Sequence, residues 1–147
     1  MPSLQVDLPV TLDTAAKQRL ARRMGEDYAE IMGVQPDIIT VSIHDLGAGG
    51  VWRCQKGDPV PAALVMCDVR KGRSAKTRAT LARRLIDICI DDLGLAPNFV
   101  KVEFTQHSAD EMYHPHLGGF NHEWTGDETG PNSKQYDHPS RDQCYHG

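Results

Sequence analysis

The sequence predicts a two-layer α+β fold, in which two copies of a β-α-β unit form one four-stranded mixed sheet with both helices on the same face. Two observations lead to this prediction. Two stretches of the 147-residue chain match each other at a constant offset of 61 residues, without gaps. Each stretch also has the pattern of a strand, a capped helix, a turn and a second strand, in that order.

The repeat is defined by four features that recur together. They are the candidate N-caps Asp13 and Ser74, the LARR segments 20–23 and 81–84, the Gly-x-x-Pro turns 33–36 and 94–97, and the strand-like runs 38–43 and 99–104. Chance easily explains one LARR match, but not the agreement of cap, helix end, turn and strand. We therefore expect repeat units at about residues 2–45 and 62–106, within a single domain that spans residues 1–124.

Both predicted helices have a start signal, an apolar stripe and a stop signal. Asp13 and Ser74 can accept hydrogen bonds from the first free backbone amides of a helix. Gly33 and Gly94 suit left-handed C-caps, and a proline three residues later prevents continuation. The stripes at helical spacing are Ala16, Leu20, Met24, Tyr28 and Ile31 in the first helix, and Leu81, Leu85, Ile88 and Cys89 in the second.

The strands are predicted from their apolar patterns. The run 38–43 alternates apolar and polar residues, whereas AALVMCDV (62–69) is almost continuously apolar and should be the best-buried strand. The two strands of each unit should be parallel and joined by a right-handed crossover. We expect Leu4, Val6 and Val41 to supply an apolar face opposite the helices, which an oligomer would cover.

The remaining segments are predicted to be irregular. GAGGVWRCQKGDPVP (47–61) should form a loop or a short hairpin at the sheet edge. Ser108 and Glu111 form a capping box, which should start a short helix that ends at Pro115. Periodicity is lost from residue 118 onward, and residues 125–147 are polar and rich in turn residues, as expected for an extended arm or a disordered tail.

Composition and charge exclude several classes of protein. The chain is 39% hydrophobic and 24% charged, with a formal charge of −4, so nothing in its charge predicts a nucleic-acid partner. No run approaches the roughly 20 apolar residues of a membrane span. The N-terminus also lacks the pattern of a secretory signal. We therefore expect a cytoplasmic protein that binds neither nucleic acid nor membrane.

Neither the cysteines nor the histidines suggest a metal or a disulfide. The cysteines are Cys54, Cys67, Cys89 and Cys144, and none form a CxxC pair. Cys67 and Cys89 have apolar neighbours and should be small buried hydrophobes. His114, His116 and His122 are close in sequence, but they do not supply the fixed ligand set that zinc requires. We expect no metal and no cofactor.

Pro2 and a basic turn are the candidate active-site residues. If the first and third strands are antiparallel neighbours, Pro2 lies near Arg70 and Arg73. A strand end, a glycine turn and a helix start form an anion site, and two guanidinium groups favour a carboxylate. The equivalent positions of the first repeat are Pro9 and Leu12, so the architecture does not require arginine there. The alternative is that both arginines are solvated turn residues.

Pro2 becomes a secondary amine if Met1 is removed. A peptide α-amino group has a pKa of roughly 7.7–8.0, and burial together with nearby cations lowers such a pKa. An amine that titrates near neutrality is a good general base, and its conjugate acid is a good proton donor. The alternative is a proline that is merely tolerated at a strand start. Ala63 stands at the equivalent position of the second repeat, so the fold does not require proline there.

These residues resemble the tautomerase superfamily. The resemblance rests on the proline after Met1, the repeated β-α-β unit and the R-x-G-R-S motif at 70–74. The chain length, the arginine spacing and HEW at 122–124 resemble its cis-3-chloroacrylic acid dehalogenase branch. The resemblance implies that Pro2 is the catalytic amine, that Arg70 and Arg73 hold the substrate carboxylate, and that no cofactor is used. It also implies a homotrimer whose subunits pack their sheets inward.

Three positions depart from the dehalogenase pattern. Tyr28 replaces a histidine of the first helix, Glu103 replaces a tyrosine of the fourth strand, and His114 replaces the glutamate credited with activating water. We treat them as auxiliary candidates, because His114 or Glu103 could act as a base. Alternatively, Tyr28 is a core aromatic residue and Glu103 a polar strand residue. Asp37 resembles an aspartate of the superfamily's malonate semialdehyde decarboxylases, although its repeat mate Asn98 favours a turn role.

The expected function is therefore that of a tautomerase. Pro2 would transfer a proton on a small 2-oxo, enol or unsaturated carboxylate, while the arginine pair binds the acid and stabilises enolate charge. One alternative is cofactor-independent hydration or dehalogenation of a 3-substituted acrylate, or a related decarboxylation. Another is a binding protein that has kept the scaffold and lost the activity.

Overall fold

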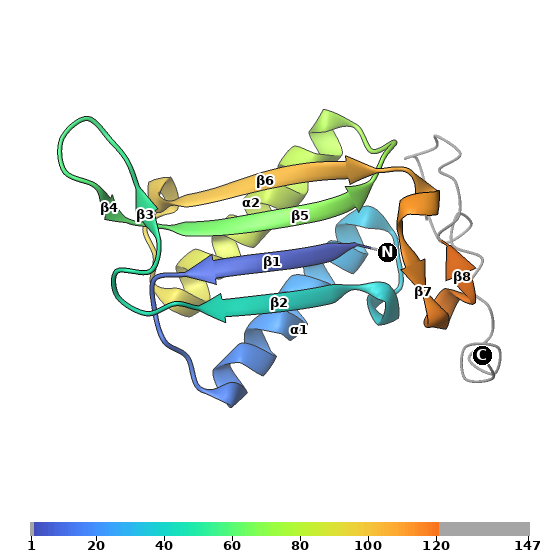
Figure 1. Cartoon of the computed structure of the whole chain (residues 1–147), viewed down its shortest axis with the longest axis horizontal. Helices are drawn as coiled ribbons and strands as arrows, with labels where there is room; N and C mark the ends of the chain where they lie inside the picture. The colour runs from blue at the N-terminus through green and yellow to red at the C-terminus, as the bar shows by residue number, and fades with distance from the viewer. Residues whose placement is uncertain (1, 121–147) are drawn as a thin grey trace.

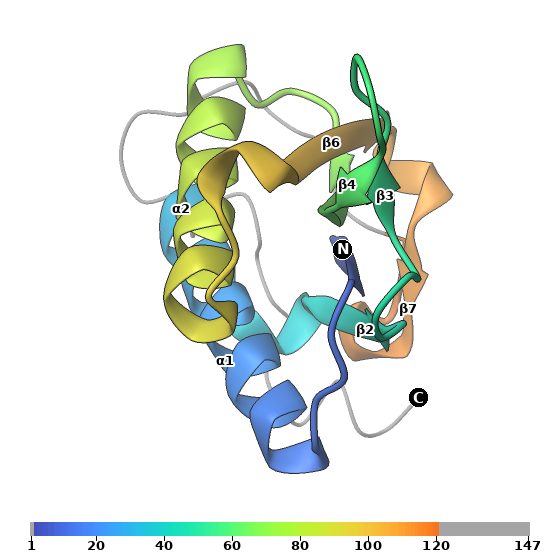
Figure 2. The ribbon, with the colours of Figure 1, turned by 90° about the vertical axis from the view of Figure 1, so that its left-hand side faces the viewer.

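The computed structural model describes residues 2–120 and arranges them in two layers, a sheet and a pair of helices that covers one of its faces (Figures 1 and 2). The helices are α1 (Thr14–Met32) and α2 (Ala75–Leu93). The sheet has the order β2-β1-β5-β6 and consists of β1 (Ser3–Leu8), β2 (Thr40–Asp45), β5 (Ala63–Arg70) and β6 (Val100–His107). The predicted α+β fold with one four-stranded mixed sheet is confirmed.

Strand pairing follows the repeat. β1 pairs with β2, and β5 pairs with β6, in parallel, while the two central strands β1 and β5 are antiparallel. Ser3 therefore lies opposite Thr40 on one side and Asp68 on the other. The start of the first strand thus lies beside the end of the third, as predicted.

The helix boundaries are set by the predicted caps. Asp13 Oδ1 accepts a hydrogen bond from the Ala16 amide at 2.8 Å, and Ser74 Oγ accepts one from the Thr77 amide at 3.1 Å. Gly33 and Gly94 end the helices with φ values of 64° and 67°, a left-handed conformation that glycine adopts without strain. The same local chemistry therefore defines both helices of the repeat.

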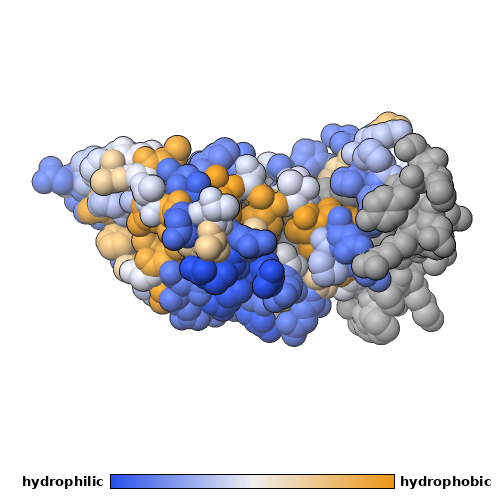
Figure 3. Space-filling view, turned by 90° about the horizontal axis from the view of Figure 1, so that it is seen from below, coloured by the Kyte–Doolittle hydropathy of each residue, from blue (hydrophilic) through white to orange (hydrophobic). Residues whose placement is uncertain are grey.

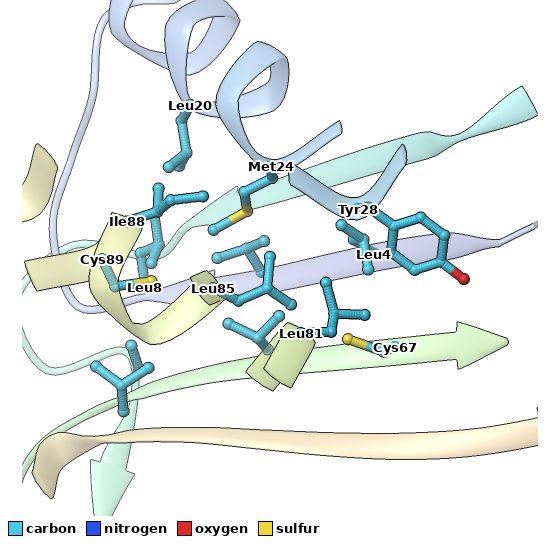
Figure 4. Packing of buried hydrophobic residues seen from close by; sticks show 14 of the residues in the cluster. Leu4, Leu8, Leu20, Met24, Tyr28, Cys67, Leu81, Leu85, Ile88 and Cys89 are labelled. Carbon is cyan, nitrogen blue, oxygen red and sulfur yellow. The ribbon is translucent and has the colours of Figure 1, made fainter. Parts of the chain in front are cut away.

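The hydrophobic core lies between the helices and the sheet (Figure 4). Leu81, Leu85, Ile88 and Cys89 of α2 are fully buried, as their spacing predicts. Cys67 and Cys89 are buried as well, and burial raises their thiol pKa values to about 12 and about 11. Both cysteines therefore act as small hydrophobic residues and not as nucleophiles.

The face of the sheet opposite the helices is polar, so the prediction of an apolar face there is wrong. Leu4 and Val6 point toward the helices and belong to the core, and Val41, the register partner of Leu4, packs against the same cluster. The opposite face, which is turned to the viewer in Figure 1, is formed by the alternate residues of each strand. On the central strands these are Ser3, Gln5, Asp7, Leu64, Met66 and Asp68. Because side chains alternate along a strand, Leu4, Val6 and Leu8 of β1 all lie on the helix side, where the helices bury them.

The edge of the molecule formed by β2 and α1 has both hydrophobic and hydrophilic surface. Figure 3 shows hydrophobic surface along the junction between the layers and hydrophilic surface over the helix. Val41 and Ile43 of β2 are partly buried there and pack against the core. This pattern is that of an amphipathic helix on an edge strand.

The remaining elements are short. β3 (Trp52–Arg53) and β4 (Val60–Pro61) form the hairpin predicted between the repeats. β7 (Tyr113–His114) pairs with β8 (Gly119–Phe120), and single 3-10 turns cover Pro36–Ile38, Pro97–Phe99, Ala109–Glu111 and Pro115–Leu117.

The capping box at Ser108 is present, but it starts one 3-10 turn instead of the predicted helix up to Pro115. The turn ends at Met112, and His114 is extended with φ of −147°. The ring of Pro115 disfavours a helical conformation for His114, so a helix up to the proline would have been unfavourable at its last residue.

Two predictions fall outside the described residues. The domain limit at residue 124 and the tail 125–147 lie beyond residue 120, as do His122, Glu123 and Trp124. Within residues 2–120, no helix has the apolar length that a bilayer crossing requires.

Candidate active site

A cavity of about 340 Å³ opens where β1 begins and β5 ends. Its walls come from both repeats and from the segment that follows β6. The lining residues are Pro2, Ser3, Thr40, Asp68, His107, Glu111, Met112, Tyr113 and His114. The structure therefore places two of the predicted site residues, Pro2 and His114, in one cavity.

Pro2 is buried and is held in place by the strand that follows it. Its carbonyl oxygen accepts a hydrogen bond from the Thr40 amide at 3.2 Å, which continues the parallel pairing of β1 with β2. Proline has no backbone N–H to contribute to the sheet, so its position at the strand start leaves no unmatched donor. Pro2 thus lines the cavity without disturbing the sheet.

Arg70 and Arg73 lie at the same end of the sheet and are both only 4% exposed. Their burial argues against the interpretation that they are solvated turn residues. Arg73 Nη2 donates to the Met32 carbonyl at the end of α1 over 2.8 Å. Between them, Gly72 has a φ of 120°, which a side chain would rarely allow. Neither arginine is among the residues that line the cavity within the described chain.

Tyr28 combines a core position with an outward hydroxyl group. Its side chain is 3% exposed and belongs to the core cluster with Leu4. Figure 4 shows the ring beside Leu4 and the hydroxyl group pointing out of the core, toward the end at which β5 terminates. The core role is thus established, and a role of the hydroxyl group stays a prediction.

Glu103 lies apart from the cavity. It is in the middle of β6 on the polar face, and its carboxylate lies 3.3 Å from Lys101 Nζ, with both side chains well exposed. Exposed pairs of this kind contribute little to stability. The structure does not bring Glu103 together with Pro2.

His114 lines the cavity with a defined tautomer. Its Nδ1 accepts a hydrogen bond from the His116 amide at 2.8 Å, so the neutral ring carries its proton on Nε2. In this form His114 can donate a hydrogen bond to a ligand. To accept a proton at Nδ1 it would have to lose the bond from His116, which makes it a poor water-activating base in this geometry.

Asp68, His107 and Glu111 form a cluster of charged and imidazole side chains in the lining that was not predicted. His107 Nε2 lies 3.7 Å from Asp68 Oδ1, and His107 Nδ1 lies 3.6 Å from Glu111 Oε2. Thr105 donates to Asp68 through its hydroxyl group and lies 3.2 Å from His107 Nε2. The signal in the sequence that could have identified them is the pattern T-x-H-x-x-x-E at 105–111. Its glutamate was interpreted only as part of a capping box.

Glu111 places a fixed negative charge on the cavity wall. Hydrogen bonds from the Ser108 hydroxyl group and then from the Ser108 amide lower the pKa of Glu111 to about 2, with a smaller effect of His107. Both Ser108 groups bind Oε1, at 2.5 Å and 2.9 Å. Oε2 is therefore the oxygen directed at His107.

The described residues contain no group of three or more side chains arranged to hold a metal ion. The rings of His114 and His116 contact each other edge to face, with centroids 6.0 Å apart. His122, the third histidine considered for a metal site, lies outside the described residues.

The three-dimensional structure of this chain is similar to those of known proteins. No protein-family model and no curated protein matches the sequence. N1, a member of the cis-3-chloroacrylic acid dehalogenase family, superposes with a TM-score of 0.70 at 20% identity, over 96% of this chain and 95% of that one. A fused 4-OT, Q0, solved as a symmetric trimer, gives a TM-score of 0.68 at 21% identity, over 80% of this chain and 93% of that one. Pt0534, inactivated by 2-oxo-3-pentynoate, gives a TM-score of 0.68 at 19% identity, over 80% of this chain and 93% of that one.

These proteins are tautomerase superfamily members. The fold that the sequence resemblance implied is therefore confirmed.

Proposed function

On this tautomerase-superfamily fold, we propose that Pro2, freed by removal of Met1, is the proton-transferring amine of an enzyme that converts the enol of a small 2-oxo carboxylate to its keto form. The observation that carries the proposal is the position of Pro2, buried in the wall of the 340 Å³ cavity. Cavities of this size accommodate small ligands.

Arg70 and Arg73 are proposed to bind the substrate carboxylate. Both are buried at the end of the sheet where Pro2 lies, and charges interact more strongly when water is excluded. The contact of Arg73 with Met32 fixes one guanidinium group in place. The same two cations would stabilise negative charge that develops on the substrate oxygen.

The proposal is tested with the processed protein and one variant. Intact mass should show that Met1 is absent, and the ketonisation of an aryl-pyruvate enol should be visible by absorbance. Pro2→Ala should lower kcat by about 10²- to 10⁴-fold, the usual contribution of a general acid or base. A retained Met1, or a Pro2→Ala variant of full activity, would contradict the proposal.

Hydration or dehalogenation of a 3-substituted acrylate is the second candidate. It is supported by the superposition on N1 over nearly the full length of both chains. Chloride release from cis-3-chloroacrylate by the processed protein tests it. The decarboxylase alternative has weaker support, because Asp37 lies outside the cavity lining and 3.6 Å from His116 Nε2. Absence of both reactions would favour a binding protein on this scaffold.

We also propose a homotrimer. One similar structure is a symmetric trimer, and the polar sheet face of this chain is not covered by any described element. Light scattering after size-exclusion chromatography measures the subunit number, and a monomeric protein would contradict this part of the proposal.

A further inference from the structure

We propose that His107 is the second proton-transferring residue of the cavity, acting on the enol oxygen of the substrate while Pro2 acts on carbon. The inference rests on the proposed function and assigns the other half of the same reaction.

The ring of His107 is oriented by its neighbours on the sheet. The Thr105 hydroxyl group donates its hydrogen to Asp68, so its oxygen is left to accept a hydrogen bond from His107 Nε2 at 3.2 Å. Carboxylates flank both ring nitrogens, with Asp68 Oδ1 3.7 Å from Nε2 and Glu111 Oε2 3.6 Å from Nδ1, so the Thr105 contact is what distinguishes the two nitrogens. The neutral ring therefore carries its proton on Nε2 and presents a lone pair at Nδ1.

Nδ1 is placed to receive a proton. Glu111 Oε2 is the nearest charged atom, and its distance of 3.6 Å is too long for a hydrogen bond. No residue of the described chain donates to Nδ1, so a substrate hydroxyl group can do so. Ser108 holds Glu111 in its ionised form, and that charge stabilises the imidazolium once Nδ1 has accepted the proton.

Pro2 and His107 line the same cavity from different strands. Pro2 precedes Ser3 on β1, Ser3 is opposite Asp68 on β5, and Asp68 is opposite Thr105 on β6. Adjacent strands are about 4.8 Å apart, so the two outer backbones of this set are separated by roughly 10 Å. A short-chain acid bound in the cavity can contact both residues, because both line it.

The step balances with these two residues. The protonated amine of Pro2 gives its proton to carbon 3 of the enol, and the C=C π electrons form the new C–H bond. His107 Nδ1 takes the proton of the enol hydroxyl group, and the O–H electrons form the carbonyl π bond. Return of that proton from His107 to Pro2, through solvent, restores the starting state without any oxidant, reductant or cofactor.

His44 provides a matched control. It lies on the same polar face, with Nδ1 2.8 Å from Asp7 Oδ1 and Nε2 3.3 Å from Ser42 Oγ. His44 thus also has an aspartate and a hydroxyl group beside its ring, but it lies at the other end of the sheet and outside the cavity lining. His107→Gln should lower kcat for enol ketonisation about 100-fold with KM changed less than about threefold. His44→Gln should leave both within about twofold.

A second variant separates chemistry from structure. Added imidazole should restore part of the kcat of His107→Ala and have no effect on His44→Ala. Unchanged kcat in His107→Gln, a loss confined to KM, or a loss in His107→Ala that imidazole does not restore would each overturn the inference. If wild-type protein lacking Met1 has no activity, the proposed function fails first; activity in wild type and His107→Gln alike overturns only the role of His107.

Discussion

The two ends of the sheet are built by the same repeat, yet they differ in chemistry. The offset of 61 residues that relates the repeats maps Pro2 onto Ala63 and Thr40 onto Lys101. A cavity lies at each place, of about 340 Å³ at the Pro2 end and about 270 Å³ at the Ala63 end. Each strand that begins a unit therefore has a cavity at its start.

The difference arises from the segments that follow the second strand of each unit. At the Pro2 end this segment supplies Glu111 and His114, which are titratable. At the Ala63 end it supplies Trp52 and Arg53, and the Arg53 guanidinium group lies 5.4 Å from the centre of the Phe99 ring. Duplication thus determines where a cavity lies, and the connecting segments determine what it can do.

The largest expected difference between the ends is in proton transfer. Pro2→Ala should abolish most of the ketonisation activity, whereas Ala63→Gly, the equivalent change at the other end, should leave kcat within about twofold. Stopped absorbance assays on both variants, with thermal unfolding to confirm the fold, make this comparison. A similar loss in both variants would show that the activity depends on the sheet and not on the amine.

A smaller difference between the two ends is expected when an arginine is removed, and it should appear in KM. Arg70→Ala should raise KM by about 10- to 100-fold, because hydrogen bonds to charged groups contribute roughly 1.5–3 kcal/mol. Arg53→Ala at the other end removes an exposed guanidinium group and should leave KM unchanged. Steady-state kinetics with one enol substrate measures both values, and equal KM values in the two variants would contradict carboxylate binding by Arg70.

The acidic groups of both ends should respond to pH in the same direction. The pKa of Glu111 is lowered from 4.5 to about 2, so its contribution to stability is complete above pH 4.5 and is lost as the pH falls toward 2. A hydrogen bond from Lys17, and then one from the Leu12 amide, lower the pKa of Asp45 as well. The Tm difference between wild type and Glu111→Gln should shrink over this range, and the Tm difference between wild type and Asp45→Asn should also shrink as the pH falls. A Tm difference that does not change with pH would contradict the lowered pKa of that carboxyl group.

The smallest effect is expected from chemical modification of the β3–β4 hairpin at the Ala63 end. Cys54 is exposed in the segment between β3 and β4, while Cys67 and Cys89 are buried with raised thiol pKa values. In a Cys144→Ser background, a maleimide should modify Cys54 alone in the folded protein and leave ketonisation within about twofold. Loss of activity on modification would show that the Ala63 end takes part in the reaction.

Much of the fold followed from local signals that act within a few residues. The caps at Asp13 and Ser74, the turns and the apolar stripes defined two units, and antiparallel central strands then placed Pro2 near Arg70. The direction of the apolar strand face did not follow, because alternation shows that Leu4 and Val6 share a face without showing which layer lies on it.

The residues that line the cavity wall could not be predicted from the sequence either. Asp68, His107 and Glu111 meet because β5 and β6 pair in one particular register and because the chain turns back after β6. Both depend on long-range packing. The local pattern in Ser108–Glu111 predicted the capping box correctly and gave no sign that its glutamate would also face a histidine.

The polar sheet face has a thermodynamic consequence for assembly. Its central strands present Ser3, Gln5, Asp7 and Asp68 beside Leu64 and Met66. Association through such a surface would remove little apolar area from water, so its heat capacity change should be small. Hydrogen bonds, ion pairs and retained water would then hold the subunits, and dilution in high salt should separate them more readily than cooling does.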